Sequence, residues 1–163
     1  MFSFRKNKGV LSNNELMAFL SGEVVPIDKV PDQIFSQKIL GDGLAIIPQD
    51  NVVLAPANGE ISVVMADTKH AIGIHLSNGM EILIHVGLDT VDMNGEGFEL
   101  FVKEGSKIKT GDPLIKFDPD KITAAGHSTI TIMVITEQAA DSKITIHSGM
   151  QAKAGETCIL SIE

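Results

Sequence analysis

Cysteine is almost absent from this chain of 163 residues. Cys158 is the only one, and it lies near the end of the sequence. A single cysteine cannot form a disulfide within the chain, which fits a protein of the reducing cytoplasm. A chain of this length can bury about 70% of the surface that it exposes when unfolded, so neither disulfides nor a structural metal is needed for folding.

Positive charge and long apolar runs are also scarce. Lysine and arginine number 13 against 21 acidic residues, which gives a net charge of −8. Proteins that bind nucleic acid need a basic stripe, so no nucleic-acid partner is expected. No run of 18 apolar residues predicts a membrane-spanning helix, and the first residues do not form a secretory signal. We expect residues 1–14 to be a flexible N-terminal segment, with a weakly amphipathic tail at a membrane surface as the alternative.

What the chain does have is a series of short apolar runs separated by turn residues. Helical spacing is confined to residues 33–40 and 119–125, and residues 90–97 are predicted to be irregular. Many short strands with turns every 8–12 residues predict an all-β protein, either a sandwich or a barrel. The length suits one domain, which we place at residues 15–163.

Two pairs of segments echo each other. Residues 104–112 and 148–156 each have two glycines six positions apart, an acid after the second glycine, and then an apolar run. Residues 17–24 and 54–61 share a similar pattern around Ser21-Gly22 and Asn58-Gly59. These echoes predict an internal duplication of turn-and-strand units within one domain, because two unevenly spaced copies are too few for a solenoid.

The most informative stretch is a hairpin over residues 70–89. Its turn contains Asn78-Gly79 between two apolar runs, which is the strongest short-range signal for a two-residue hairpin loop. With such a loop, Ile72 faces His85, and His70 and His85 become diagonal neighbours on one face at roughly 7–8 Å. His75 then lies on the other face; a three-residue loop would reverse this parity.

Two imidazoles on one face can serve different purposes. The second strand is apolar on both sides, so His85 could be a core histidine with both ring nitrogens hydrogen-bonded. Alternatively, a neutral imidazole is a competent nucleophile at pH 7, and apolar neighbours keep it neutral. A second imidazole beside it could donate a hydrogen bond to a phosphoryl oxygen. No Gly-x-x-x-x-Gly-Lys-Ser/Thr loop is present, so phosphate would come from another molecule and not from a nucleotide by that route.

A metal site and a carrier module are the alternatives from the residues alone. Two histidines suit zinc, but a catalytic site needs three protein ligands, and neither His-Glu-x-x-His nor paired cysteines occur. The glycine turns resemble those of biotinyl and lipoyl domains, yet the exposed lysine turn of such carriers is missing. No metal and no cofactor is therefore predicted. Asp89 could orient a ring or a partner, or it could simply cap a turn.

The motifs around the two histidines resemble a known family. The segments Thr68-Lys69-His70-Ala71-Ile72-Gly73 and Ile84-His85-Val86-Gly87-Leu88-Asp89-Thr90-Val91 are similar to the glucose-type enzyme IIA (EIIA) domain of the bacterial phosphoenolpyruvate-dependent sugar phosphotransferase system. Residues 95–98, the turn at 105–111, and Val30-Pro31-Asp32 with Gly41-Asp42-Gly43 extend the resemblance from about residue 15 to the end of the chain.

The resemblance implies a fold, an activity and partners. The fold would be an antiparallel β-sandwich with barrel-like closure. His85 would accept a phosphoryl group from the phosphocarrier protein HPr and pass it to a cysteine on the IIB domain of a membrane sugar permease. His70 would stabilise the phosphohistidine, with Thr68 and Asp89 as polar neighbours. The expected partner surface consists of Phe35, Ile39, Leu40, Ile72, Val86 and Val91.

The overall prediction is thus a cytoplasmic, monomeric phosphotransferase component. A zinc-dependent hydrolase on a related β-scaffold, or a regulatory binding protein that has lost relay, are the alternatives.

Overall fold

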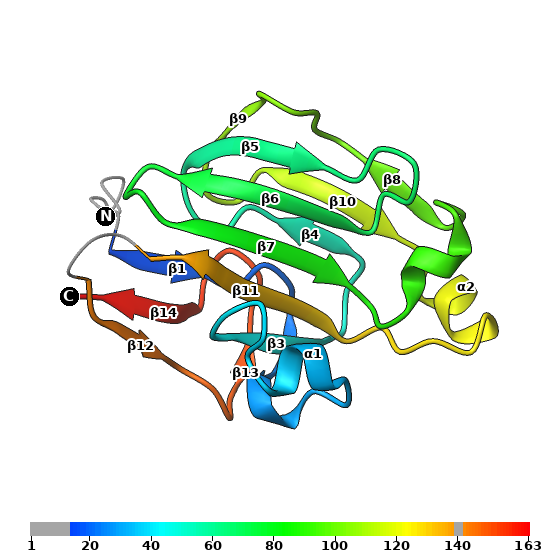
Figure 1. Ribbon diagram of the computed structural model, residues 1–163, viewed down its shortest axis with the longest axis horizontal. Coiled ribbons are helices and arrows are strands. Elements are labelled where there is room, and N and C mark those ends of the chain that lie inside the picture. Colours follow the sequence, from blue (N-terminus) through cyan, green and yellow to red (C-terminus); the bar gives the residue numbers. More distant parts are fainter. Residues whose placement is uncertain (1–13, 139–141) are drawn as a thin grey trace.

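The computed structural model describes residues 14–138 and 142–163. The predicted flexible segment therefore lies outside the described residues, apart from Asn14. The strands form one eight-stranded sheet and two three-stranded sheets, and every paired strand is antiparallel (Figure 1). The prediction of an all-β, antiparallel fold with a few short helical turns is confirmed.

The strand order of the large sheet is β13 (Gln151–Ala152), β2 (Gly22–Pro26), β3 (Gly43–Pro48), β11 (Thr131–Glu137), β7 (Glu81–Val86), β6 (Ala71–Leu76), β5 (Gly59–Val64) and β9 (Lys107–Ile108). The order of the first small sheet is β1 (Glu15–Met17), β14 (Cys158–Ile162) and β12 (Ile144–Ile146). The order of the second is β4 (Val52–Leu54), β10 (Pro113–Phe117) and β8 (Phe98–Leu100).

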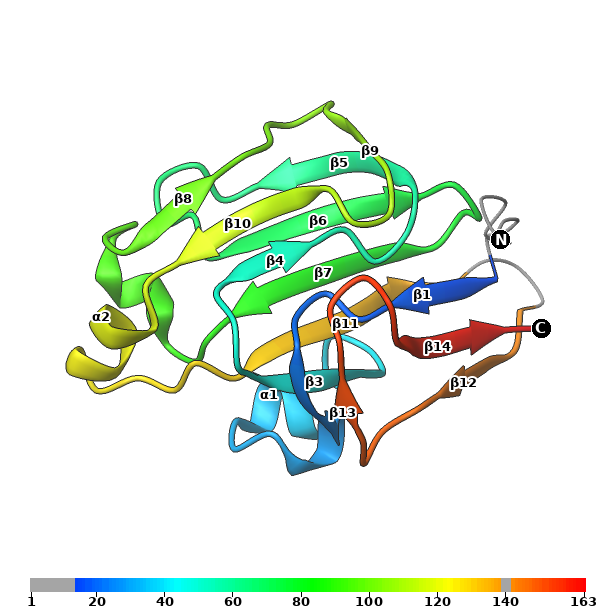
Figure 2. The same ribbon diagram turned by 180° about the vertical axis from the view of Figure 1, so that it is seen from behind.

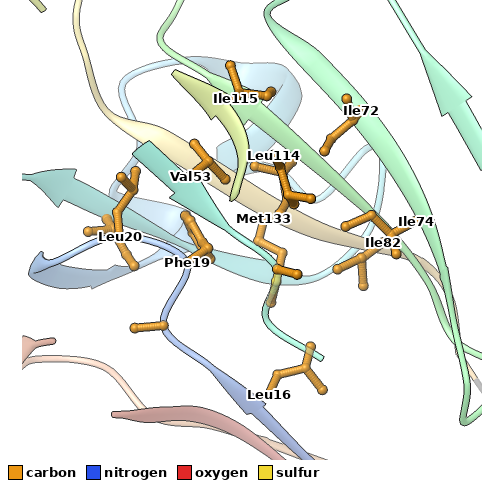
Figure 3. Close-up of a cluster of buried hydrophobic side chains, with 14 of the residues drawn as sticks. Leu16, Phe19, Leu20, Val53, Ile72, Ile74, Ile82, Leu114, Ile115 and Met133 are labelled. Atoms are coloured by element: carbon orange, nitrogen blue, oxygen red, sulfur yellow. The ribbon is translucent and has the colours of Figure 1, made fainter. Parts of the chain in front are cut away.

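The two small sheets cover one face of the large sheet, and the main core lies between these layers (Figure 2). Figure 3 shows how side chains from both layers meet there, including Leu16 and Val53 from the small sheets and Ile74 and Ile82 from the large one. Apolar residues alternate along β6 and β7 because one face of these strands is buried in this core. The other face is left for the site described below.

Two short helical elements cover part of that other face. The 3₁₀ turn η2 (Ile27–Lys29) and helix α1 (Gln33–Ser36) bury Ile27, Val30 and Phe35 against β3 and β11. Helix α1 begins at Asp32, whose carboxylate accepts a hydrogen bond from the amide of Ile34 at 2.9 Å. The predicted helix over 33–40 is confirmed but ends early.

Helix α2 (Pro119–Ala124) matches the second helical prediction. Asp118 caps it, and Pro119 occupies a first-turn position where no amide hydrogen is needed. None of the helices in the described part of the chain is long and apolar enough to cross a membrane.

The internal duplication predicted from the two echoes is visible in the hydrogen bonds. In each copy the two glycine amides of the turn donate to carbonyls of the matching earlier segment. The bonds are Gly105 to Ile61 and Gly111 to Ala55 in one copy, and Gly149 to Val24 and Gly155 to Ala18 in the other, all at 2.8–2.9 Å. The strand order of the large sheet mirrors this repeat, because β9, β5 and β6 on one side correspond to β13, β2 and β3 on the other.

The core makes a stability prediction. Phe19 is fully buried between the layers, whereas Phe101 is 45% exposed. Replacing Phe19 by alanine should lower the free energy of unfolding by about 3–5 kcal/mol, because it removes a large buried ring and leaves a cavity. Phe101→Ala is the matched control and should change it by less than about 0.5 kcal/mol. Urea denaturation of both variants measures the difference, and equal effects would contradict this description of the core.

Candidate functional site

The hairpin that carries the histidines has a three-residue loop, so the predicted two-residue loop is wrong. Leu76 and Met80 close the loop through a hydrogen bond of 2.8 Å from the Leu76 amide to the Met80 carbonyl. Gly79 has a left-handed φ of 95°, but Asn78 keeps a negative φ. A type I′ turn needs positive φ at both central residues, so that turn does not form. Asn78 instead accepts a side-chain hydrogen bond from the Met80 amide at 2.9 Å.

The longer loop shifts the register of β6 and β7 by one residue. Ala71 faces His85, where Ile72 was expected, and Ile74 faces Ile82. His75 pairs with Glu81 and lies on the same face as His85, not on the opposite face as predicted. Its Nδ1 is 3.4 Å from a carboxylate oxygen of Glu81.

The two predicted histidines nevertheless meet. The rings of His70 and His85 are edge to face, with centroids 4.7 Å apart and an interplanar angle of 89°. Strict alternation in the observed register would send His70 into the core. It escapes that rule because β6 begins only at Ala71, and the preceding Lys69 has a left-handed φ of 59° that turns the chain. The two rings meet because His70 lies just before the strand, where its side chain does not have to follow the alternation of the strand residues.

The tautomer of His85 is fixed by its partner. Nδ1 of His85 lies 2.8 Å from the carbonyl oxygen of Gly87. A carbonyl can only accept, so Nδ1 carries the proton in this bond and the neutral ring has its lone pair on Nε2. Gly87 adopts a left-handed φ of 78°, which turns its carbonyl back toward the ring.

His70 is held by a hydroxyl group. Its Nδ1 lies 2.8 Å from Oγ1 of Thr68. A hydroxyl can donate or accept, so this contact leaves the choice of tautomer to the chemistry at Nε2. The backbone adds a second link, because the amide of Val86 donates to the carbonyl of His70 at 2.7 Å.

Burial keeps both rings neutral. Desolvation, and secondarily the neighbouring His85, lower the pKa of His70 from 6.5 to about 4. Burial also lowers the pKa of His85. The Gly87 carbonyl and the carboxylates of Asp32 and Asp89 oppose that shift by favouring the charged ring. At pH 7 the site therefore presents uncharged imidazoles beside two acidic groups.

Two predicted neighbours of His85 differ in their exposure to solvent: Asp89 is exposed, whereas Phe35 is buried. Asp89 is exposed and has a left-handed φ of 61°, directly before the 3₁₀ helix η3 (Thr90–Met93). This helix occupies part of the stretch expected to be irregular. Phe35 of α1 is buried, and its ring contacts His85 with centroids 5.1 Å apart.

The predicted partner surface is partly accessible. Ile39, Leu40 and Val91 are exposed apolar residues in or near α1 and η3. Ile72 and Val86 are fully buried in the main core, so neither is available to a partner. The register explains Ile72, which pairs with Ile84 instead of His85 and so lies on the inner face; Val86 lies on the face opposite to that of His85 in any register because it is the next residue in the strand.

The sequence reasoning assigned no role to several groups that the structure brings to the site. The carbonyl of Gly87, the carboxylate of Asp32 and the hydroxyl of Thr90 all lie around His85 or its loop. A glycine two residues after the histidine was the available signal for the first.

Across residues 14–138 and 142–163, no three histidine, cysteine, aspartate or glutamate side chains are grouped so as to hold a metal ion.

The depressed pKa of His70 makes the stability of the fold depend on pH. In the unfolded chain this ring titrates near 6.5, whereas in the folded protein it stays neutral down to about pH 4. Between these values the unfolded state binds the extra proton, so stability falls as pH falls. We expect His70→Gln to lose less unfolding free energy between pH 7 and pH 5 than the wild type does. Urea denaturation at both pH values measures this, and an equal loss would contradict it.

Comparisons with known proteins agree with this geometry. Residues 14–141 match the family model of the phosphoenolpyruvate-dependent sugar phosphotransferase system, EIIA 1. The "PTS system glucose-specific EIIA component" of Bacillus cereus is 47% identical over 163 residues, covering 99% of this chain and 98% of the relative. Its counterpart in Halalkalibacterium halodurans is 44% identical, covering 97% and 91%.

A solved structure supports the same conclusion. Glucose permease IIA from Mycoplasma capricolum superimposes with a TM-score of 0.83 at 32% identity, and the match covers 98% of this chain and 99% of that one. The family match spans most of the chain and includes both histidines. The chain therefore belongs to the EIIA family of the phosphoenolpyruvate-dependent sugar phosphotransferase system.

Proposed function

We propose that His85 carries the phosphoryl group in the relay to which this family belongs. The observation that supports this most directly is the hydrogen bond from His85 Nδ1 to the Gly87 carbonyl. It leaves the lone pair on Nε2, the nitrogen that a phosphoryl donor would have to meet. Burial lowers the pKa of this ring, so the nucleophilic, unprotonated form is present at pH 7.

The transfer can be written with the residues of this chain. Nε2 of His85 forms a bond to phosphorus while the bond between phosphorus and the donor breaks. The proton stays on Nδ1, where it is hydrogen-bonded to the Gly87 carbonyl, so no proton has to leave the ring during the step. In the second transfer the same bond on Nε2 breaks as the acceptor attacks phosphorus.

His70 would stabilise the phosphorylated state. Its ring centroid is 4.7 Å from that of His85, close enough for its Nε2 to reach a phosphoryl oxygen. If the Thr68 hydroxyl donates to Nδ1 of His70, then Nε2 of the neutral ring carries a hydrogen and can donate it. The Thr68 hydroxyl can adapt to this tautomer because it can donate as well as accept, whereas the Gly87 carbonyl allows only one tautomer of His85.

The partners would be HPr as donor and the IIB domain of a membrane sugar permease as acceptor. Glucose is the sugar indicated by the names of the relatives. Phe35 contacts the reacting ring, and Ile39, Leu40 and Val91 offer exposed apolar surface on the adjoining elements. Asp32, Asp89 and the net charge of −8 would attract a basic partner face. We place this relay in the cytoplasm, with residues 15–163 acting as one monomeric domain.

The alternatives have less support. A zinc-dependent hydrolase needs a third ligand beside the two histidines, and the comparisons favour neither that activity nor a binding protein that has lost relay.

The relay is tested by intact mass. Incubated with phosphoenolpyruvate, enzyme I and HPr at mildly basic pH, the wild type should gain one acid-labile phosphoryl group. His85→Ala should gain none, because the nucleophile is gone. His75→Ala is the matched control, since His75 lies on the same sheet face outside the pair, and it should be phosphorylated like the wild type. A phosphorylated His85→Ala would contradict the assignment.

The docking surface is tested by a charge. Ile39 is 64% exposed, so Ile39→Glu should leave the free energy of unfolding within about 0.5 kcal/mol of the wild type. It should slow phosphorylation by HPr about tenfold, because a charge would be desolvated at the interface. The control is Phe101→Glu. Phe101 directly follows β8, which belongs to one of the small sheets, on the other face of the large sheet from α1. An unchanged rate for Ile39→Glu would remove this residue from the docking surface.

A further inference from the structure

Thr90 is a buried polar residue to which the proposed relay assigns no role. Its side chain is fully buried, and its hydroxyl donates to the carbonyl of Val86 at 2.5 Å. Val86 immediately follows His85 and precedes Gly87, whose carbonyl holds the His85 ring. The hydroxyl of Thr90 therefore reaches the peptide unit on which the position of that carbonyl depends.

The peptide unit between Val86 and Gly87 is fixed at both ends. Thr90 holds its oxygen, and the carbonyl of Ile130 accepts from its Gly87 amide at 2.9 Å. The methyl group of Thr90 packs on Gly87 as well, because a Cβ built on Gly87 would lie 2.5 Å from it. These contacts leave little freedom for the residue that presents its carbonyl to Nδ1 of His85.

The same residue also connects to the second histidine. The amide of Val86 donates to the carbonyl of His70 at 2.7 Å, while its carbonyl accepts from Thr90. Thr90 is thus linked through Val86 to both members of the pair, by one hydrogen bond to the residue that follows His85 and by two hydrogen bonds to the backbone of His70. It lies at the start of η3, directly after the left-handed Asp89, so the helix brings its side chain back over the loop.

We propose that Thr90 is a positioning residue for the phosphoryl relay, which holds the Gly87 carbonyl in place and thereby keeps the proton of His85 on Nδ1 and the lone pair on Nε2. This inference rests on the proposed function of His85. Groups that fix the tautomer of a metal-bound imidazole from behind commonly matter by a factor of about 10–100, and we expect an effect of similar size on the reacting ring of His85.

A purely structural role for Thr90 makes a different prediction. In that case the loss of its hydroxyl would lower stability without changing the His85 ring. Thr131 offers a matched comparison, because it is also fully buried and its hydroxyl also donates to a backbone carbonyl, that of Thr129 at 3.0 Å. Thr131 faces Val86 on the neighbouring strand but is not in the loop that holds the ring.

The experiment compares Thr90→Val, Thr90→Ser and Thr131→Val with the wild type. Thr90→Val has nearly the same shape without the hydroxyl, whereas Thr90→Ser keeps the hydroxyl. Two-bond ¹H–¹⁵N spectra of the histidine rings report the tautomer of His85, and the rate of phosphorylation from HPr reports the relay. We expect Thr90→Val to shift part of the His85 population to the Nε2–H tautomer and to slow phosphorylation about tenfold or more. Thr90→Ser and Thr131→Val should keep the wild-type tautomer and rate.

The outcomes separate the two ideas. A wild-type tautomer and rate in Thr90→Val would overturn the role of Thr90, as would an equal change in Thr131→Val. If Thr90→Val does not fold, Thr90→Ala replaces it as the hydroxyl-free variant, and loss of the tautomer in Thr90→Ser would also overturn the proposal. If the wild type gains no phosphoryl group, the proposed function fails, and the tautomer comparison by itself supports or overturns the positioning role.

Discussion

The hydrogen bond from His85 Nδ1 to the Gly87 carbonyl is the interaction on which the site depends. The two residues are close in the sequence, because only Val86 lies between them. The bond nevertheless requires a left-handed backbone at Gly87, which few residues other than glycine adopt readily. A side chain at that position would also collide with Thr90 and the carbonyl of Ser128. One glycine thus determines which nitrogen of the histidine is nucleophilic, because a neutral ring with a proton on one nitrogen has its lone pair on the other.

Burial and charge act on this ring in opposite directions. Burial lowers the pKa of His85 and favours the neutral imidazole, which is able to attack phosphorus. Asp32 and Asp89 stabilise positive charge nearby, and they would repel a phosphoryl group that arrived without a cationic partner. A site of this kind is suited to receive phosphate from a protein that carries its own positive charge, in keeping with a relay between proteins and not with chemistry on free phosphate.

The fold supplies a rigid frame for this arrangement. Two related halves each contribute strands to the large sheet and one small sheet around a common core, and their equivalent turns dock through equivalent hydrogen bonds. The histidine site breaks that internal repeat, because it lies where β6 begins, β7 ends and α1 covers only part of the outer face. Side chains beyond the end of a strand do not have to alternate between its two faces. His70, which directly precedes β6, can therefore turn toward His85.

The sequence by itself determined the fold class, the duplication, the two histidines and the family, because apolar spacing, glycine turns and the residues of the motifs are written along the chain. It did not determine the register of the hairpin. Asn78-Gly79 allows both a two-residue and a three-residue loop, and only the packing of Ile72, Ile82 and their neighbours into one core decides between them. That choice moved Ile72 to the inner face, where Val86 also lies, and moved His75 to the face of His85. Tertiary structure also decided the contacts around the histidines, above all those of the Gly87 carbonyl and the buried Thr90. The identity of a residue does not tell where its carbonyl points or whether its side chain is buried.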